Sequence, residues 1–155
     1  MFEKAVKEIE IFDGLKQKQV DELFSWLQRR EYPAGTVIFK EGRLPNGLYV
    51  LVGGSVSVLK ETGSGRLKLT EIEAPSFFGE MGLLNGKQRT AAIRAQTNVI
   101  SGLLATDLFV RKLEENNLTA LRIALNVGRL LAKRLGDTSN KLTTQTALIA
   151  RHMPR

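Results

Sequence analysis

The stretch FFGEMGLLNGKQRTAA, residues 77–92, is the most unusual segment of the chain. Glycines flank Glu80, so the backbone there can come close to a bound molecule. A short helix around residues 82–84 would expose N–H groups that suit an anion. Arg89 could bind a phosphate through two parallel N–H donors, and Glu80 could accept hydrogen bonds from ribose hydroxyls. A surface loop with an internal Glu80–Arg89 ion pair fits the same residues.

Short apolar pieces surround this stretch between Glu31 and about Ala105, separated by glycines and turn residues. The pair Gly53-Gly54 predicts a tight hairpin, because both glycines accept positive φ, and residues 62–65 predict the next turn. Short strands with turn signals at this spacing predict an antiparallel barrel or sandwich. The expected strands are residues 36–39, 48–52, 55–58, 66–69, 91–95 and 99–104.

Helical periodicity frames this β region on both sides. Residues 14–30 predict one amphipathic helix, with its apolar face at Val20, Leu23, Phe24 and Leu27. A short helix is expected at residues 107–115, followed by a long helix from about residue 118 to 150. Asn116-Asn117 can end the first of these helices and cap the second.

The long helix carries two apolar faces. Leucines and small residues recur at alternating steps of three and four, which is a heptad pattern. We expect one face to pack on the barrel and the other to meet a partner helix; the alternative is a single wide core face on a monomer. The heptad stripe is Leu118, Leu121, Leu125, Gly128, Ala132, Leu135, Ser139 and Leu142, and the second set is Ile123, Val127, Leu130 and Leu131.

The composition of the chain lacks the residues that most catalytic and metal sites require. The 155 residues fit one domain, 1–155, and contain no cysteine and a single histidine, His152. We therefore expect no metal site and no enzyme; a cupin-type metal barrel would need a His/Glu ligand cluster that one histidine cannot supply. The net charge of +7 suggests an anionic partner: a phosphorylated small molecule, nucleic acid or a membrane surface. The absence of cysteine, of a signal peptide and of a membrane span favours a cytoplasmic protein.

Residues 78–83 and 89–91 closely resemble the phosphate-binding cassette of the cyclic nucleotide-binding domain family, and the resemblance spans roughly residues 11–142. It implies a mainly β fold with flanking helices: a double-stranded β-helix (jelly-roll, cupin-like) barrel at about 31–105, an N-terminal helix, and long C-terminal helices at about 107–150. Outside the cassette it rests on Ile11-Phe12, Leu15, Tyr32, Gly35, Ile38-Phe39, Glu41-Gly42, Leu48-Tyr49, Gly54, Val56 and Val58.

The resemblance also implies roles for individual residues. Arg89 matches the arginine that pairs with the cyclic phosphate, and Glu80 the glutamate that holds the ribose 2′-hydroxyl. Backbone amides around Gly82 and Leu83 would add donors to the phosphate, and the Thr90 hydroxyl would reach the ligand. The expected ligand-binding residues are Val58, Leu69, Thr70, Ile72, Phe78, Gly79, Glu80, Met81, Gly82, Leu83, Arg89, Thr90, Ala91, Arg134, Thr138 and Ser139.

The end of the long helix resembles the dimer helix of the catabolite activator branch of the family. There a neighbouring Thr-Ser pair contacts adenine, one residue from each subunit, with an arginine close by; Thr138, Ser139 and Arg134 match these. This implies cyclic AMP as the ligand and a homodimer through the helix. Cyclic GMP is the alternative, because Thr90 could contact the 2-amino group of a guanine.

About 13 residues follow Leu142, too few for the helix-turn-helix of that branch, so direct DNA binding is not expected. The prediction is a ligand-controlled regulatory module without a cofactor, in which binding is coupled to the position of the C-terminal helix. The alternative is a DNA-associated transcription regulator that acts with a separate DNA-binding subunit.

Overall fold

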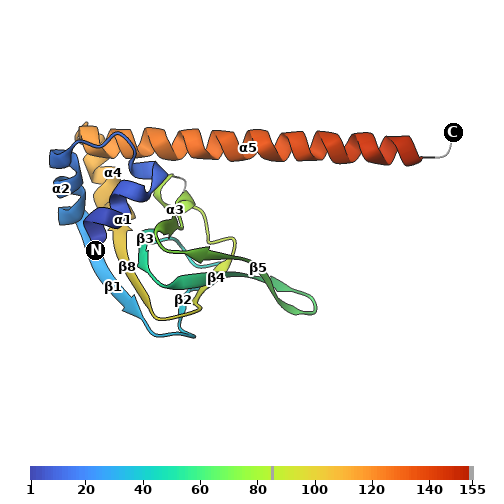
Figure 1. Cartoon of the computed structure of the whole chain (residues 1–155), viewed down its shortest axis with the longest axis horizontal. Coiled ribbons are helices and arrows are strands. Elements are labelled where there is room, and N and C mark those ends of the chain that lie inside the picture. The colour runs from blue at the N-terminus through green and yellow to red at the C-terminus, as the bar shows by residue number, and fades with distance from the viewer. Residues whose placement is uncertain (85, 154–155) are drawn as a thin grey trace.

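The computed structural model describes residues 1–84 and 86–153; Asn85, Pro154 and Arg155 lie outside the described residues. The chain begins with helices and returns to helices after eight strands (Figure 1). The helices are α1 (Phe2–Glu8), the 3-10 helix η1 (Glu10–Phe12), α2 (Gln17–Trp26), α3 (Met81–Leu84), α4 (Thr106–Glu114) and α5 (Leu118–His152). The strands are β1 (Leu27–Tyr32), β2 (Val37–Phe39), β3 (Gly47–Gly53), β4 (Ser55–Thr62), β5 (Gly65–Glu73), β6 (Ser76–Phe78), β7 (Ala92–Ala95) and β8 (Val99–Ala105).

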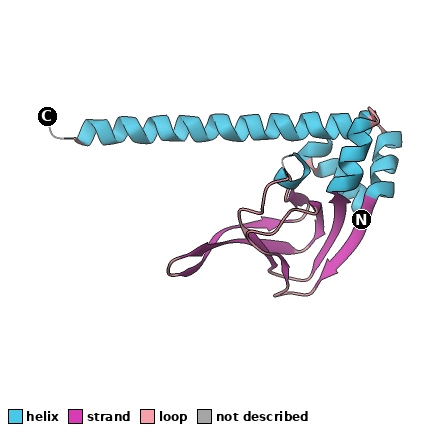
Figure 2. Ribbon diagram, turned by 180° about the vertical axis from the view of Figure 1, so that it is seen from behind, coloured by secondary structure: helices cyan, strands magenta, loops and turns pink. Residues whose placement is uncertain are grey.

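The strands form two antiparallel sheets, in the orders β1-β8-β3-β6 and β2-β7-β4-β5. The mainly β class with flanking helices is confirmed, but the barrel is not closed: in the described part of the chain the sheets remain two layers of four strands. Figure 2 shows the helices gathered on one side of the sheets. The central strands β3 and β8 of the first sheet are covered by helices on the outside and by the second sheet on the inside.

Side chains of strand β3 alternate between two hydrophobic clusters, one under the helices and one between the sheets. Leu48 and Val50 point into the cluster under the helices, whereas Tyr49 and Leu51 point into the cluster between the sheets. The rings of Tyr49 and Phe78 stack there with centroids 5.0 Å apart. Both clusters are buried, so β3 fixes the spacing between the helical layer and the second sheet.

The hairpin predicted at Gly53-Gly54 is wrong. Strands β3 and β4 belong to different sheets, so these residues cross between layers instead of joining paired strands. Of these two glycines, only Gly54 has a positive φ, which is +83°. The amide of Ser55, directly after it, donates to Thr97 Oγ1 at 3.0 Å and so ties the crossing to the β7–β8 turn.

Gly54→Ala is expected to destabilise the protein by about 2–3 kcal/mol, because the left-handed backbone disfavours a side chain. The added Cβ would also lie 2.2 Å from the backbone oxygen of Asn98. The thermal midpoint should fall by roughly 5–10 °C in a melting curve followed by circular dichroism. Gly63→Ala is the matched control, since no described atom lies within 4 Å of its added Cβ. Equal midpoints for the two variants would contradict the prediction.

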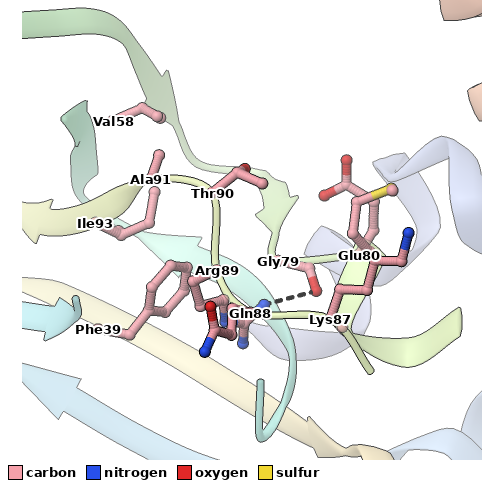
Figure 3. A pocket seen from close by; sticks show the side chains of 12 residues that line it. Phe39, Val58, Gly79, Glu80, Lys87, Gln88, Arg89, Thr90, Ala91 and Ile93 are labelled. Atoms are coloured by element: carbon pink, nitrogen blue, oxygen red, sulfur yellow. Dashed lines mark hydrogen bonds between the residues drawn. The ribbon is translucent and has the colours of Figure 1, made fainter. Parts of the chain in front are cut away.

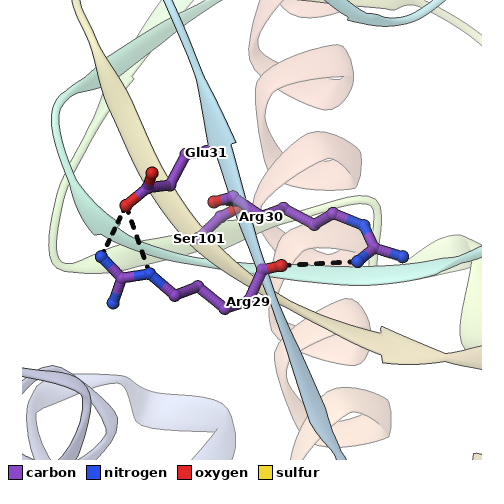
Figure 4. Close-up of polar contacts among 4 residues, drawn as sticks. All are labelled: Arg29, Arg30, Glu31 and Ser101. Carbon is purple, nitrogen blue, oxygen red and sulfur yellow. Dashed lines mark hydrogen bonds and ion pairs between the residues drawn. The ribbon is translucent and has the colours of Figure 1, made fainter.

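The helix predicted for residues 14–30 ends earlier, at Trp26, and β1 begins at Leu27. Pairing with β8 takes over from helical periodicity, with Leu27 opposite Leu104 and Tyr32 opposite Val99. Arg29 and Glu31, two residues apart on one side of the strand, form a 2.6 Å ion pair (Figure 4). Ser101 of β8 donates to the backbone oxygen of Arg30 across the pair at 3.3 Å. The sheet edge is thus an exposed, charged strand.

Helix α5 confirms the predicted start and the predicted cap. Asn117 caps it, its side chain accepting from the amide of Ala120 at 3.0 Å. Ile123 and Val127 are buried against the body, whereas the leucines of the heptad stripe are exposed. The helix has 35 residues, and its second half extends away from the body (Figure 1). Neither α5 nor another helix among the described residues is long and apolar enough to cross a membrane.

Candidate functional site

A cavity of about 430 Å³ opens beside the cassette residues that the sequence singled out. The β2 and β7 strands, Val58 of β4, and the loop around α3 form its wall (Figure 3). Apolar side chains line one part, and polar side chains and charged side chains of both signs line another. The lining residues are Phe39, Val58, Gly79, Glu80, Met81, Gly82, Lys87, Gln88, Arg89, Thr90, Ala91 and Ile93.

Arg89 is a buried cation at the wall of this cavity, with 7% of its surface exposed. Its Nη1 donates to Gly79 O at 3.1 Å and its Nη2 to Gly47 O at 2.8 Å. Its guanidinium carbon lies 4.1 Å from the centre of the Phe39 ring. The buried Nε has no hydrogen-bond partner among the residues that the structure describes. A buried charged group with an unused donor is costly unless an anion completes its shell.

Burial lowers the pKa of the Arg89 guanidinium, while Tyr49 and the Glu80 carboxylate act in the opposite direction. Arginine remains charged in proteins, so the group presents a fixed positive charge to the cavity. Carbonyl oxygens rather than a carboxylate hold it in place. Its charge is therefore available to a ligand, and the cavity suits a small molecule that carries one anionic group beside an apolar part.

Two glycines make room for this guanidinium. A Cβ added at Gly79 would lie 2.7 Å from Arg89 Nη1, and one at Gly82 would lie 2.9 Å from the same atom. Gly79 also has φ of +79°, which favours glycine. The pattern of glycines around Glu80 therefore has a packing reason. The amides of Gly82 and Leu83, expected to face a phosphate, donate here to Gly79 O and Glu80 O, both at 3.1 Å.

Glu80 pairs with Arg134 of α5 and not with Arg89, which corrects the internal ion pair considered as an alternative. Arg134 Nη1 lies 2.6 Å from Glu80 Oε1, and the Glu80 side chain is 15% exposed. The Arg134 guanidinium also lies 6.0 Å from the centre of the Phe77 ring. This contact joins the cassette to the last helix, so a ligand hydroxyl at Glu80 would share or replace the bond to Arg134.

The structure brings half of the expected ligand-binding residues together around the cavity. Of the others, Phe78 and Leu83 lie in the core, and Ile72 packs against the cluster between the sheets. Leu69 and Thr70 are exposed on β5, as are Thr138 and Ser139 on α5. The residues at the cavity are Val58, Gly79, Glu80, Met81, Gly82, Arg89, Thr90 and Ala91.

Four cavity residues were not expected: Phe39, Lys87, Gln88 and Ile93. Lys87 and Gln88 directly precede Arg89, and Ile93 follows Ala91 by the strand period of two, so position relative to the cassette could have found them. Phe39 is remote in sequence, and its contact with Arg89 follows only from the fold. Within residues 1–84 and 86–153, no three His, Cys, Asp or Glu side chains gather as a metal site requires.

Comparisons with known proteins identify the family of the chain. The sequence model of the cyclic nucleotide-binding domain family matches residues 29–116, which include the strands of both sheets and the cassette. The Cyclic AMP receptor protein of Thermus thermophilus is 32% identical over 136 residues, covering 85% of this chain and 60% of that protein. The cAMP-dependent protein kinase regulatory subunit of Aspergillus fumigatus is 32% identical over 113 residues, covering 73% of this chain and 27% of that protein.

Solved structures show the same fold. The crystal structure of the Thermus thermophilus Catabolite Activator Protein superposes with a TM-score of 0.78 at 29% identity, covering 88% of this chain and 63% of that one. A cyclic nucleotide-binding domain from Methylobacillus flagellatus gives a TM-score of 0.77 at 21% identity, covering 92% of this chain and 80% of that one. The chain spans three fifths or less of the two curated relatives. With the family model matching more than half of its length, the chain belongs to the cyclic nucleotide-binding domain family.

Proposed function

We propose that the chain is a regulatory module that binds cyclic AMP in the cavity beside Arg89 and acts by binding rather than by catalysis. The observation that carries the proposal is the buried guanidinium of Arg89, a residue that lines the cavity and whose Nε has no hydrogen-bond partner among the described residues. A cyclic phosphate has one negative charge and oxygens that accept from such a fork. Similar proteins named for cyclic AMP, among them a bacterial receptor and a kinase regulatory subunit, support the choice of ligand.

Within the cavity each part of the nucleotide has a counterpart. Arg89 would pair with the phosphate, Glu80 would accept a bond from the ribose 2′-hydroxyl, and the Thr90 hydroxyl would lie beside them. Val58 and Ile93 supply an apolar wall for the purine. Because Glu80 is bound to Arg134 of α5, a ligand that draws on Glu80 changes a contact of the last helix. Binding and the position of α5 are then linked.

The preference for cyclic AMP involves a second copy of the chain. Thr138 and Ser139 lie four and five residues beyond Arg134, or about 6–8 Å farther along the helix. In one copy these residues are exposed, and Thr138 Oγ1 donates to Arg134 O at 2.9 Å. We propose a parallel homodimer through the exposed stripe of α5, in which the Thr-Ser pair of two helices reaches the adenine.

Isothermal titration of the wild-type chain with cyclic AMP and with cyclic GMP tests the proposed function. Cyclic AMP is expected to bind the more tightly, because hydroxyl groups on α5 pair with the exocyclic amine and ring nitrogens of adenine. Tighter binding of cyclic GMP would overturn the preference for adenine and would favour a contact between Thr90 and the 2-amino group of guanine. Absence of heat with both nucleotides at millimolar concentration would overturn the proposed function.

A further inference from the structure

The backbone that carries Arg89 and Thr90 is held from outside the cavity. The Arg89 amide donates to Arg43 O at 2.7 Å, and the Gly42 amide donates to Arg89 O at 2.8 Å. These two bonds join the cassette to the turn between β2 and β3, in the manner of a short antiparallel bridge. The orientation of both side chains toward the ligand therefore depends on a turn nearly fifty residues away in sequence.

Lys60 of β4 binds the peptide group that follows, between Thr90 and Ala91. Its Nζ donates to Thr90 O at 2.6 Å and lies 2.8 Å from Glu41 Oε1. The other carboxylate oxygen, Glu41 Oε2, accepts from the amide of Glu61 at 3.0 Å. The ammonium of Lys60 and the amide of Glu61 hold the pKa of the Glu41 carboxyl below its ordinary value. One ion pair thus ties the β2–β3 turn, strand β4 and the cassette together.

We propose that Lys60 and Glu41 are positioning residues for nucleotide binding, which fix the backbone at Thr90, next to Arg89, so that both side chains face the ligand before it arrives. The proposal rests on the proposed binding of a nucleotide at Arg89. Neither residue lines the cavity, so their effect passes through the Thr90 carbonyl. Fixing a binding loop in advance lowers the entropy lost on binding, and affinity rises without a new contact to the ligand.

A different role for Lys60 makes the opposite prediction. If Lys60 acted only as a positive charge near the phosphate, Glu41→Gln would release that charge from its partner and strengthen binding. If the Lys60–Glu41 ion pair instead fixes the backbone at Thr90, a role that we call the brace, Glu41→Gln weakens binding. The ammonium of Lys60 would then lose the carboxylate that holds it beside Thr90 O. Glutamine keeps an acceptor for the Glu61 amide, so the change acts mainly on the pairing with Lys60.

The test is titration of the full chain with cyclic AMP for Lys60→Met, Glu41→Gln and the double variant. Each single change is expected to weaken binding about tenfold, the loss of one charge-assisted bond to the loop. The double variant should be no weaker than the weaker single variant, because both act through one brace. Lys60→Arg keeps a charged donor and should recover affinity to within about threefold of wild type.

Lys68→Met is the matched control. Lys68 of β5 forms an ion pair with Glu71, with side-chain exposures of 46% and 41% against 43% and 25% for Lys60 and Glu41. It does not line the cavity, and its loss should change affinity by less than about twofold. Without ligand, the melting midpoints of all these variants should stay within about 3 °C of wild type, since exposed pairs contribute little stability.

Three results would overturn the brace while leaving nucleotide binding intact: wild-type affinity in Lys60→Met, tighter binding in Glu41→Gln, or an equal loss in Lys68→Met. The proposed function itself fails only if the wild-type chain binds neither cyclic nucleotide. If Lys60→Met does not fold, Glu41→Gln alone still separates the brace from a free charge by the direction of its effect.

Discussion

Arg89→Gln is expected to weaken cyclic AMP binding by about thirtyfold or more in isothermal titration. Arg89 is a buried cation that lines the cavity, and its Nε has no hydrogen-bond partner among the described residues. Removal of one partner of a buried charged hydrogen bond costs about 2–5 kcal/mol, which corresponds to between thirtyfold and several thousandfold in affinity. Glutamine retains a donor but neither the charge nor the fork, so the ligand phosphate would lose its buried counter-charge.

Arg89→Lys separates charge from geometry. Lysine keeps the positive charge but has no planar fork, so it cannot donate at once to Gly79 O, Gly47 O and a phosphate in the way that Arg89 can. We expect at least a tenfold loss of affinity for this variant. Full affinity in Arg89→Lys would show that charge alone is sufficient at this position.

Arg94→Gln is the matched control for these changes. Arg94 lies five residues farther along, on β7, and does not line the cavity. A ligand at a hundred times its dissociation constant stabilises the folded state by about 2.7 kcal/mol, so cyclic AMP should raise the melting midpoint of the wild type and of Arg94→Gln. Arg89→Gln should show no such rise. A folded Arg89→Gln variant that binds within threefold of wild type would place the phosphate elsewhere.

Local signals predicted local structure well. Asn117 was expected to cap the last helix from its residue type and position, and its side chain does accept from the helix amide of Ala120. The cassette can be recognised from the sequence because its residues lie within one contiguous stretch. The glycines around Glu80 predict close approach of the backbone to a bound molecule, whereas in the structure Gly79 and Gly82 border the guanidinium of Arg89.

Pairings between distant segments could not be predicted in this way. Gly53-Gly54 has the composition of a hairpin turn, but turn residues do not specify which sheet the next strand joins. The helical periodicity of residues 14–30 contains no information about β8. Because residues from Leu27 onward pair with β8, they form a strand and not the end of the helix. The contacts of Arg89 with Phe39, and of Glu80 with Arg134, join segments 50 and 54 residues apart. Such contacts depend on the assembled fold.

The exposed stripe of α5 is expected to make the chain a dimer in solution, and a double change to Leu135→Glu and Leu142→Glu is expected to make it a monomer. Both leucines are exposed in the single chain and lie in the second half of α5. That half of the helix extends from the body (Figure 1). Small residues at Gly128 and Ala132 would let two helices approach closely. A stripe of this kind repeats every seven residues, the spacing that two helices bury against each other.

The expected effect is large because a twofold dimer loses each leucine twice. Burial of one leucine contributes about 1.5–3 kcal/mol, so four lost contacts amount to about 6 kcal/mol or more, over ten-thousandfold in the dissociation constant. Sedimentation velocity measures this directly. The control is the pair Asn140→Glu and Thr144→Glu, which places the same charges on α5 away from the stripe. A control that dissociates as completely would assign the effect to charge rather than to the stripe.

Orientation is tested with a single cysteine, because the chain has none of its own. In a parallel, in-register pair the two copies of Ser139 lie opposite each other on the stripe, within reach of a disulfide; in an antiparallel pair they lie apart. Ser139→Cys should therefore form a covalent dimer on mild oxidation, and Asn140→Cys, off the stripe, should form far less. This pairing is the one in which we propose that the Thr138-Ser139 hydroxyls of two helices reach the adenine. If the monomeric variant still bound cyclic AMP with wild-type affinity, the partner helix would have no part in recognising the base.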